Sequence, residues 1–193
     1  RGVTKAFELY NEEKVDEALQ VLLEIRGGND FDNAFLARFI GNLYAQKDPK
    51  QAIKYLEQAT KPDVLSFADQ AGSLKLVADL QSMENMHRDA IKNYESWLRF
   101  TGENDADVYL RIANAYYQLQ DYQKVLVPID NAIRYAREPN KQHYMLKMGA
   151  LYESKNYPKT VETVETMVQL FPEERQFWVY LGNFYTLVEN YEK

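Results

Sequence analysis

Few side chains in this chain of 193 residues are placed for catalysis or metal binding. The chain has no cysteine and only two histidines, which excludes thiolate zinc sites, disulfides and thiol nucleophiles. His87 and His143 are far apart in sequence, and neither has a carboxylate placed as a partner in a metal site. No serine lies in a nucleophile-elbow sequence. The sequence therefore predicts a protein that is not an enzyme and has no metal site and no cofactor.

Three asparagines indicate binding instead, because they occupy equivalent positions in a repeated motif. The motif recurs at residues 40–44, 112–116, 148–152 and 181–185, and its asparagines are Asn42, Asn114 and Asn183. A carboxamide offers both a donor and an acceptor, so it can hold the backbone of an extended peptide. The alternative is that asparagine is simply common at this exposed position.

The motif belongs to a longer repeat, which predicts the fold. Small or β-branched residues recur in two series: Ala6, Gly41, Ala78, Ala113, Gly149 and Gly182, and then Ala18, Ala52, Ala90, Val125 and Thr160. Apolar residues three and four positions away place each series on one helical face. Two antiparallel helices approach closely only where neither carries a large side chain. Each unit is therefore predicted to be a helix A, a tight turn and a helix B.

We expect an all-α fold, a right-handed superhelix or solenoid of antiparallel helix pairs with about five and a half repeats. The units of this single array are expected at residues 1–32, 33–70, 71–105, 106–140, 141–174 and, in part, 175–193. Gly41 and Ala52, like Gly149 and Thr160, are one residue closer together than Ala113 and Val125, and we assign that deletion to the turn between the helices.

Polar residues and prolines mark the expected helix ends. Asn29, Asp48, Asp121 and Asn190 are expected to cap the helices that follow them. Pro128 lies inside a helix B and is expected to kink it.

These residues resemble the tetratricopeptide repeat (TPR), whose period is about 34 residues. Residues 113–122 and 178–185 carry the best matches, while Gln81 and Thr160 depart from the usual residue types. The resemblance covers essentially the whole chain. It implies a scaffold whose A helices line a concave groove that binds a peptide or a protein.

The predicted binding surface is the stripe of each helix A opposite its packed face. We expect it to include Arg38, Asn42, Lys75, Asp79, Asn114, Tyr117, His143 and Asn183. His143 begins a helix and is expected to be exposed, like Tyr109 and Tyr117, whereas the core is expected to hold Tyr94, Tyr116, Tyr152 and Tyr185. Some cochaperone TPRs clamp a C-terminal carboxylate with lysine and asparagine. Here Asp79 would repel that carboxylate, so we favour an ordinary peptide or protein surface.

Residues 97–102, 108–119 and 168–172 also resemble periplasmic TPR proteins that accompany TonB/ExbB/ExbD energy-transduction systems of bacteria with an outer membrane. That resemblance implies a periplasmic adaptor of a TonB-type transport system. The alternatives are a cytoplasmic location, a regulatory or targeting segment of a larger enzyme, and a structural module that self-associates as a homo-oligomer through its C-terminal helix.

The charge and hydropathy of the chain limit its partners. The net charge is −6 and no strongly basic stretch is present, so we expect no nucleic-acid partner. No stretch approaches the roughly 18 apolar residues of a membrane span. The sequence opens at Arg1 and closes within a repeat, so we expect it to be a fragment of a longer protein.

Overall fold

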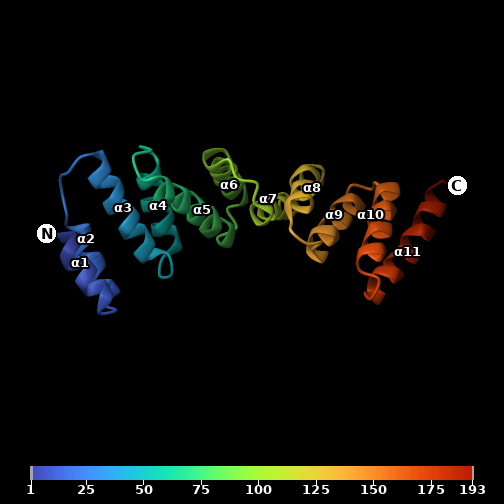
Figure 1. Ribbon diagram of the computed structural model, residues 1–193, viewed down its shortest axis with the longest axis horizontal. Coiled ribbons are helices and arrows are strands. Elements are labelled where there is room, and N and C mark those ends of the chain that lie inside the picture. The colour runs from blue at the N-terminus through green and yellow to red at the C-terminus, as the bar shows by residue number, and fades with distance from the viewer. Residues whose placement is uncertain (1, 193) are drawn as a thin grey trace. The chain divides into compact units, whose positions relative to one another are not determined.

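All the regular secondary structure in the part of the chain that the structure describes is helical, as the repeat predicts (Figure 1). The computed structural model describes the backbone of residues 2–192 and the side chains of residues 2–190. Eleven α-helices and one short 3-10 helix occupy this range, without any strand. They are α1 (Gly2–Asn11), α2 (Val15–Leu23), α3 (Asp30–Tyr44), α4 (Pro49–Thr60), α5 (Phe67–Met83), α6 (His87–Thr101), α7 (Ala106–Gln118), η1 (Tyr122–Val125), α8 (Leu126–Tyr135), α9 (Lys141–Glu153), α10 (Tyr157–Leu170) and α11 (Arg175–Glu192).

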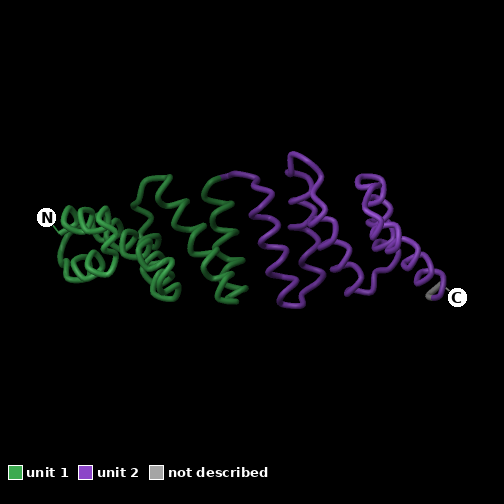
Figure 2. Tube along the Cα trace, turned by 90° about the horizontal axis from the view of Figure 1, so that it is seen from below, with its two compact units in different colours: residues 1–101 green, residues 102–193 purple. Residues whose placement is uncertain are grey.

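Consecutive helices form pairs, as in Figure 1, within two compact units of residues 1–101 and 102–193 (Figure 2). In unit 1, α1 packs on α2, α3 on α4 and α5 on α6. In unit 2, α7 packs on η1 and α8, and α9 on α10. The first member of each pair is helix A and the second is helix B. The last helix, α11, takes the place of a sixth helix A and packs on α10.

Two helices begin a few residues earlier than the predicted unit boundaries at residues 33 and 71. The α3 helix begins after Asn29, whose side chain accepts a hydrogen bond from the backbone N–H of Asp32 at 2.8 Å. The α5 helix begins after Ser66, which caps Asp69 in the same way at 3.2 Å. The capping residues, rather than the repeat period, therefore determine these helix starts.

The small residues permit the close approach of helices A and B, as predicted. A Cβ atom on Gly41 of α3 would lie 2.6 Å from Cγ of Leu56 in α4, well inside van der Waals contact. Leu56 is itself fully buried. Six alanines of the two series are also fully buried: Ala6, Ala18, Ala52, Ala78, Ala90 and Ala113.

Gln81 departs from the repeat because it belongs to a polar network inside unit 1. Its side chain is only 2% exposed. Its Nε2 donates to Glu57 of α4 at 3.3 Å, and its Oε1 accepts from Asn93 of α6 at 2.8 Å. Burial, followed by the nearby Asp89, raises the pKa of the Glu57 carboxyl. The network joins α4, α5 and α6 and satisfies both ends of the buried carboxamide.

The predicted caps are partly confirmed. Asp48 accepts from the N–H of Gln51 at 3.3 Å ahead of Pro49, and Asn29 caps α3 as described above. Asp121 precedes η1 but makes no capping hydrogen bond through its side chain. The prediction for Asn190 is wrong, because α11 continues through this residue to Glu192. Its neighbours Leu187 and Val188 continue the helical pattern, which outweighs the single capping residue.

The segment around Pro128 is not one continuous α-helix as predicted, and the kink itself stays a prediction. Helix B of the fourth pair begins as the 3-10 turn η1, and α8 begins only at Leu126. Pro128 is therefore the third residue of α8, where its missing N–H removes no hydrogen bond within that helix. The chain therefore accommodates Pro128 by changing helix type before the proline.

Candidate functional site

One open groove in unit 2 lies between the A helices α7 and α9. It encloses about 400 Å³ and is lined by Leu110, Asn114, Tyr117, Gln142, Met145 and Leu146. The carboxamides of Asn114 and Gln142 project from exposed positions on two different helices. The groove therefore combines two carboxamides, each with a hydrogen-bond donor and an acceptor, with the apolar side chains of Leu110, Met145 and Leu146.

Asn114 and Tyr117 line this groove, and Tyr117 is only partly exposed. Their role in binding a partner stays a prediction. The Tyr117 ring makes an edge contact with Tyr122, with the ring centroids 5.1 Å apart. Burial, followed by the charge of Glu153, raises the pKa of the Tyr117 hydroxyl. The hydroxyl is therefore protonated at neutral pH and available as a hydrogen-bond donor. Tyr109, the other predicted binding aromatic, instead stacks on Tyr135 outside the groove lining.

Gln142 and Met145 were missed because the sequence register of the fifth pair was wrong by one residue. The turns after α7 and α9 have the same geometry, with Gln120 and Lys155 both at a φ of 60° and 35 residues apart. No residue is deleted from the second turn. At this spacing Gly149 is the counterpart of Asn114, and Gln142 and Met145 are counterparts of Asp107 and Leu110.

Contacts around Gly149 agree with this register. A Cβ atom on Gly149 would lie 3.2 Å from the hydroxyl oxygen of Tyr117, and not against helix B of its own pair. Leu151 takes the packed position predicted for Tyr152 and is buried, whereas Tyr152 is exposed. The prediction that Tyr152 belongs to the core is therefore wrong.

The same register corrects the prediction for His143, which is buried and not part of the groove. Its side chain is 4% exposed and occupies the position of the buried Val108 in the preceding helix A. No hydrogen-bond partner lies near its Nδ1 within the described residues. Burial lowers the pKa of His143, and the charge of Asp107 opposes that shift only in part. His143 is thus a neutral packing residue at physiological pH.

A second open groove, in unit 1, lies between α1 and α3. It encloses about 190 Å³, and its lining consists of Phe7, Tyr10, Phe35, Arg38, Phe39, Asn42 and Leu43. The predicted residues Arg38 and Asn42 belong to it. Arg38 forms an ion pair with Asp69 of α5 at 3.2 Å, which neutralises the charge that Arg38 brings to the lining.

Phe7, Tyr10 and Phe39 of this second groove were missed by sequence analysis. Phe7 and Tyr10 come from α1, where the repeat is weakest, and both are exposed. Phe7 packs on Phe39 with the ring centroids 4.6 Å apart. Asn42, the residue after Gly41, lines the same groove. Phe7 follows Ala6 in the same way, so the register contained enough information to find it.

Lys75 and Asp79 lie on α5 but direct their functional groups toward helix B of their own pair. The Lys75 ammonium lies 5.2 Å from the centroid of the Trp97 ring. The Asp79 carboxylate accepts a hydrogen bond from the hydroxyl of the buried Tyr94. These contacts stabilise the α5–α6 pair. A role of either residue in binding a partner remains a prediction.

Asn183 is exposed on α11, as its counterparts Asn42 and Asn114 are on α3 and α7. Tyr185, which was expected in the core, is instead exposed, and so is Trp178. Tyr94 is buried as predicted, and Tyr116 is partly buried. Tyr185 differs from Tyr116 because no helix B of the described chain covers α11.

Among the described residues, no group of three or more His, Asp or Glu side chains is arranged to hold a metal ion. Within the same range, none of the helices combines the length and the apolar character that crossing a membrane requires.

Several solved TPR structures are similar to this chain. MamA from Desulfovibrio magneticus RS-1 matches with a TM-score of 0.62 and 18% identity over 83% of this chain and 88% of its own. YrrB, described as a TPR protein with an unusual peptide-binding site, matches with a TM-score of 0.63 and 14% identity over 82% and 79%. A TPR protein from Parabacteroides merdae matches with a TM-score of 0.63 and 14% identity over 97% and 72%. No family model and no curated protein matches the sequence. At these identities, the similarity shows a shared fold.

Proposed function

Because the chain has the all-α TPR solenoid fold, we propose that it is a protein-interaction scaffold that binds an extended peptide segment on the exposed face of its A helices. The observation that carries this proposal is the groove between α7 and α9. It places the carboxamides of Asn114 and Gln142 beside the apolar Met145 and Leu146. Backbone groups of a peptide would pair with the carboxamides, and an apolar side chain would fill the groove.

The groove between α1 and α3 also suits peptide binding. It would accept a different kind of peptide side chain from the groove between α7 and α9. Its lining is mainly aromatic, and Arg38 is already paired with Asp69. An uncharged aromatic or aliphatic side chain therefore fits this groove better than an acidic one. The unusual peptide-binding site of YrrB provides a precedent for peptide binding by a protein of this fold.

Site-specific photo-crosslinking in the native cell tests the proposal. A photoreactive residue at Asn114 or Met145 should give adducts with a partner, which mass spectrometry identifies. The matched control is Gln169, an exposed residue on the helix B α10. Adducts from Gln169 but not from the two groove positions would show that the partner uses the opposite face.

Binding measurements with the captured peptide segment then test whether the Asn114 carboxamide contributes to affinity. Loss of one hydrogen bond costs about 0.5–1.5 kcal/mol, so Asn114→Ala should weaken binding roughly 2-fold to 12-fold. Gln169→Ala should leave the affinity unchanged. Equal affinities for Asn114→Ala and the unchanged chain would remove Asn114 from the site.

A narrower proposal is that the scaffold is a periplasmic adaptor of a TonB-type system. It is supported by the sequence resemblance of residues 97–102, 108–119 and 168–172. Capture of TonB, ExbD or an associated envelope protein from Asn114 would support it. Capture of cytosolic proteins would reject this compartment and leave the scaffold function intact.

A further inference from the structure

The groove between α7 and α9 has two different ends, because the two helices run in the same direction. Near their starts, Asp107 of α7 is close enough to His143 of α9 for its charge to oppose the lowering of the His143 pKa that burial causes. Near their ends, Tyr117 of α7 lies against Gly149 of α9, where a Cβ atom would be 3.2 Å from the Tyr117 hydroxyl oxygen. The C-termini of α7 and α9 therefore lie at the same end of the groove.

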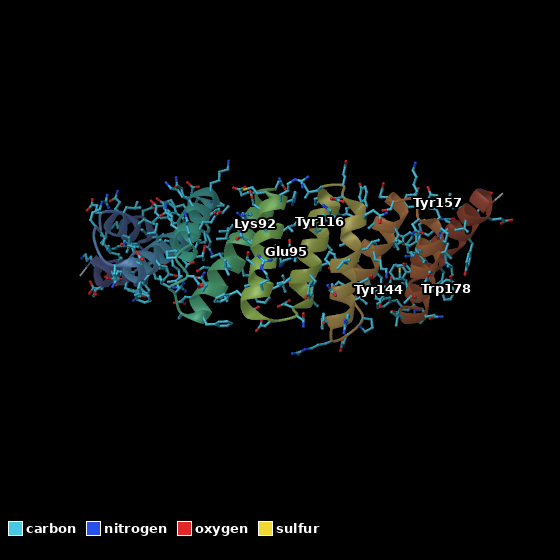
Figure 3. All side chains as sticks on the ribbon, turned by 90° about the horizontal axis from the view of Figure 1, so that it is seen from above. Lys92, Glu95, Tyr116, Tyr144, Tyr157 and Trp178 are labelled. Atoms are coloured by element: carbon cyan, nitrogen blue, oxygen red, sulfur yellow. The ribbon has the colours of Figure 1, made fainter. Side chains whose placement is uncertain are left out.

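Glu153 places a carboxylate at this end. It is the last residue of α9 and lies one helical turn beyond Gly149, so both residues are on one face of the helix. After burial, the charge of Glu153 is the next cause that raises the pKa of the Tyr117 hydroxyl. The preceding residue, Tyr152, is directed toward α10, where its ring packs on Tyr157, labelled in Figure 3, with the ring centroids 5.9 Å apart. We call Tyr117, Gly149 and Glu153 the turn end of the groove.

The negative charge at the turn end is not neutralised within the described part of the chain. Glu153 is exposed and forms no ion pair with any described side chain, including Lys155, the nearest basic residue along the chain. Neither α7 nor α9 has a basic residue in its last turn. Because the C-terminus of a helix carries a partial negative charge, the two helix ends add to the field of the carboxylate.

At the opposite end of the groove the charges are paired. Asp107 forms an ion pair with Arg111, one turn along α7, with the Oδ2 and Nε atoms 3.0 Å apart. Lys141, at the start of α9, is paired with Glu174. The buried His143 is neutral at physiological pH, because burial lowers its pKa. The groove is therefore electrically asymmetric, and its unpaired charge is negative and lies at the turn end.

Given peptide binding at this groove, which is itself our proposed function, we propose that the groove selects a peptide segment with a lysine or arginine close to an apolar residue. The basic side chain lies at the turn end, where Glu153 pairs with it and the Tyr117 ring offers its face to the cation. The apolar side chain packs on Met145 and Leu146, while the Asn114 carboxamide pairs with the peptide backbone. An acidic side chain at the turn end would be repelled by Glu153 and by both helix C-termini.

Selection of random peptides, displayed on phage, against the purified chain tests the proposal. We expect the enriched peptides to carry a lysine or arginine near an apolar residue, to bind Asn114→Ala more weakly, and to be lost in a selection against Glu153→Lys. Enriched peptides that depend on Asn114 but show no excess of basic residues would overturn the charge preference and leave peptide binding intact. Failure to enrich any peptide would overturn peptide binding and the charge preference together.

The affinity of one enriched peptide, synthesised with blocked ends so that only its side chains are charged, measures the contribution of Glu153. Glu153→Gln should weaken binding about 2-fold to 5-fold, the range expected for an exposed ion pair. The matched control is Glu162→Gln, which removes an exposed carboxylate from the helix B α10 and should leave the affinity unchanged. Circular dichroism verifies that both variants fold. Equal affinities for Glu153→Gln and the unchanged chain would overturn the role of Glu153.

Exchanging both charges tests whether the contact is direct. A peptide whose basic residue is replaced by glutamate should bind the unchanged chain at least about 5-fold more weakly than the original peptide. Glu153→Lys should bind this glutamate peptide more tightly than the unchanged chain does, because the pair is restored with opposite polarity. Both differences should shrink in about 1 M salt, where the Debye length is about 3 Å. A glutamate peptide that binds Glu153→Lys no better than the unchanged chain would overturn the direct contact.

Discussion

Replacing Gly41 by alanine is expected to destabilise unit 1, although alanine is the better helix former. In a helix interior, alanine gains about 1 kcal/mol over glycine. Here its Cβ atom would lie 2.6 Å from Cγ and 2.9 Å from Cδ2 of Leu56, and 3.2 Å from the Leu56 backbone nitrogen. Because Leu56 is fully buried, its side chain has little room to move away. Overpacking costs about 1–3 kcal/mol, or more where the backbone must move.

Because the Leu56 backbone is also too close, we take the upper part of that range, about 2–3 kcal/mol, and the net expectation for Gly41→Ala is a loss of about 1–2 kcal/mol. Urea denaturation followed by Trp97 fluorescence measures it, since Trp97 lies in unit 1 and Trp178 in unit 2. With a slope of about 2 kcal/mol/M, the urea midpoint should fall by roughly 0.5–1 M. Gly72→Ala is the matched control on α5, where a Cβ atom meets nothing within 4 Å. It should stabilise unit 1 by about 0.5–1 kcal/mol.

A double-mutant cycle with Leu56 isolates the contact. Leu56→Ala alone should cost about 2–5 kcal/mol, because it leaves a cavity in the core. In that background Gly41→Ala should become neutral or stabilising, since its clash partner is gone. Stabilisation by Gly41→Ala in the unchanged chain, equal to that of Gly72→Ala, would refute the reasoning that this glycine sets the approach of α3 and α4.

Three further substitutions test other contacts. Trp97→Ala should lower the free energy of unfolding by about 3–5 kcal/mol in chemical denaturation, because Trp97 is only 6% exposed. A loss below about 1 kcal/mol would contradict its packing role. Gln81→Leu should cost about 1–3 kcal/mol in the same assay, because Glu57 and Asn93 lose their buried partner; unchanged stability would show that water replaces Gln81. His143→Phe tests the effect of pH on stability. Burial lowers the pKa of His143 in the folded chain. As the pH falls below about 6.5, His143 therefore binds a proton in the unfolded chain before it does so in the folded chain. The unchanged chain should therefore lose up to about 1 kcal/mol between pH 7.5 and 5.5, and His143→Phe should lose less; equal losses would reject this assignment.

The sequence predicted the helix pairs because their determinants are local. The small residues Gly41 and Ala52 recur at helical spacing, and Asp48 with Pro49 marks the start of a helix within four residues. Such patterns depend on neighbours along the chain and can be interpreted without knowing the tertiary structure. Asn42 and Asn114, which line the two grooves, were predicted for the same reason, since they lie next to the small residues.

The fifth pair shows where sequence reasoning fails. Gly149 was aligned with Ala113 because both are small, yet Gly149 is small to accommodate Tyr117 of the neighbouring helix A. A contact between consecutive A helices is not encoded within one repeat, so the composition of the motif could not reveal it. The capping residues could have done so, because Asp105 and Asn140 precede α7 and α9 at a spacing of 35 residues.

The hydrogen bonds of Gln81 affect how unit 1 opens. Arrays of helix pairs usually unfold progressively from an end, because each pair contacts only its neighbours. Here one buried carboxamide connects α4, α5 and α6, so none of these helices can separate without breaking bonds to another. Amide protons of α4 and α6 should therefore exchange with solvent as one cooperative block, slower than those of α1 and α2. Fraying from the N-terminal end would stop at α4, and unit 1 would keep its central helices closed while its first pair opens and recloses.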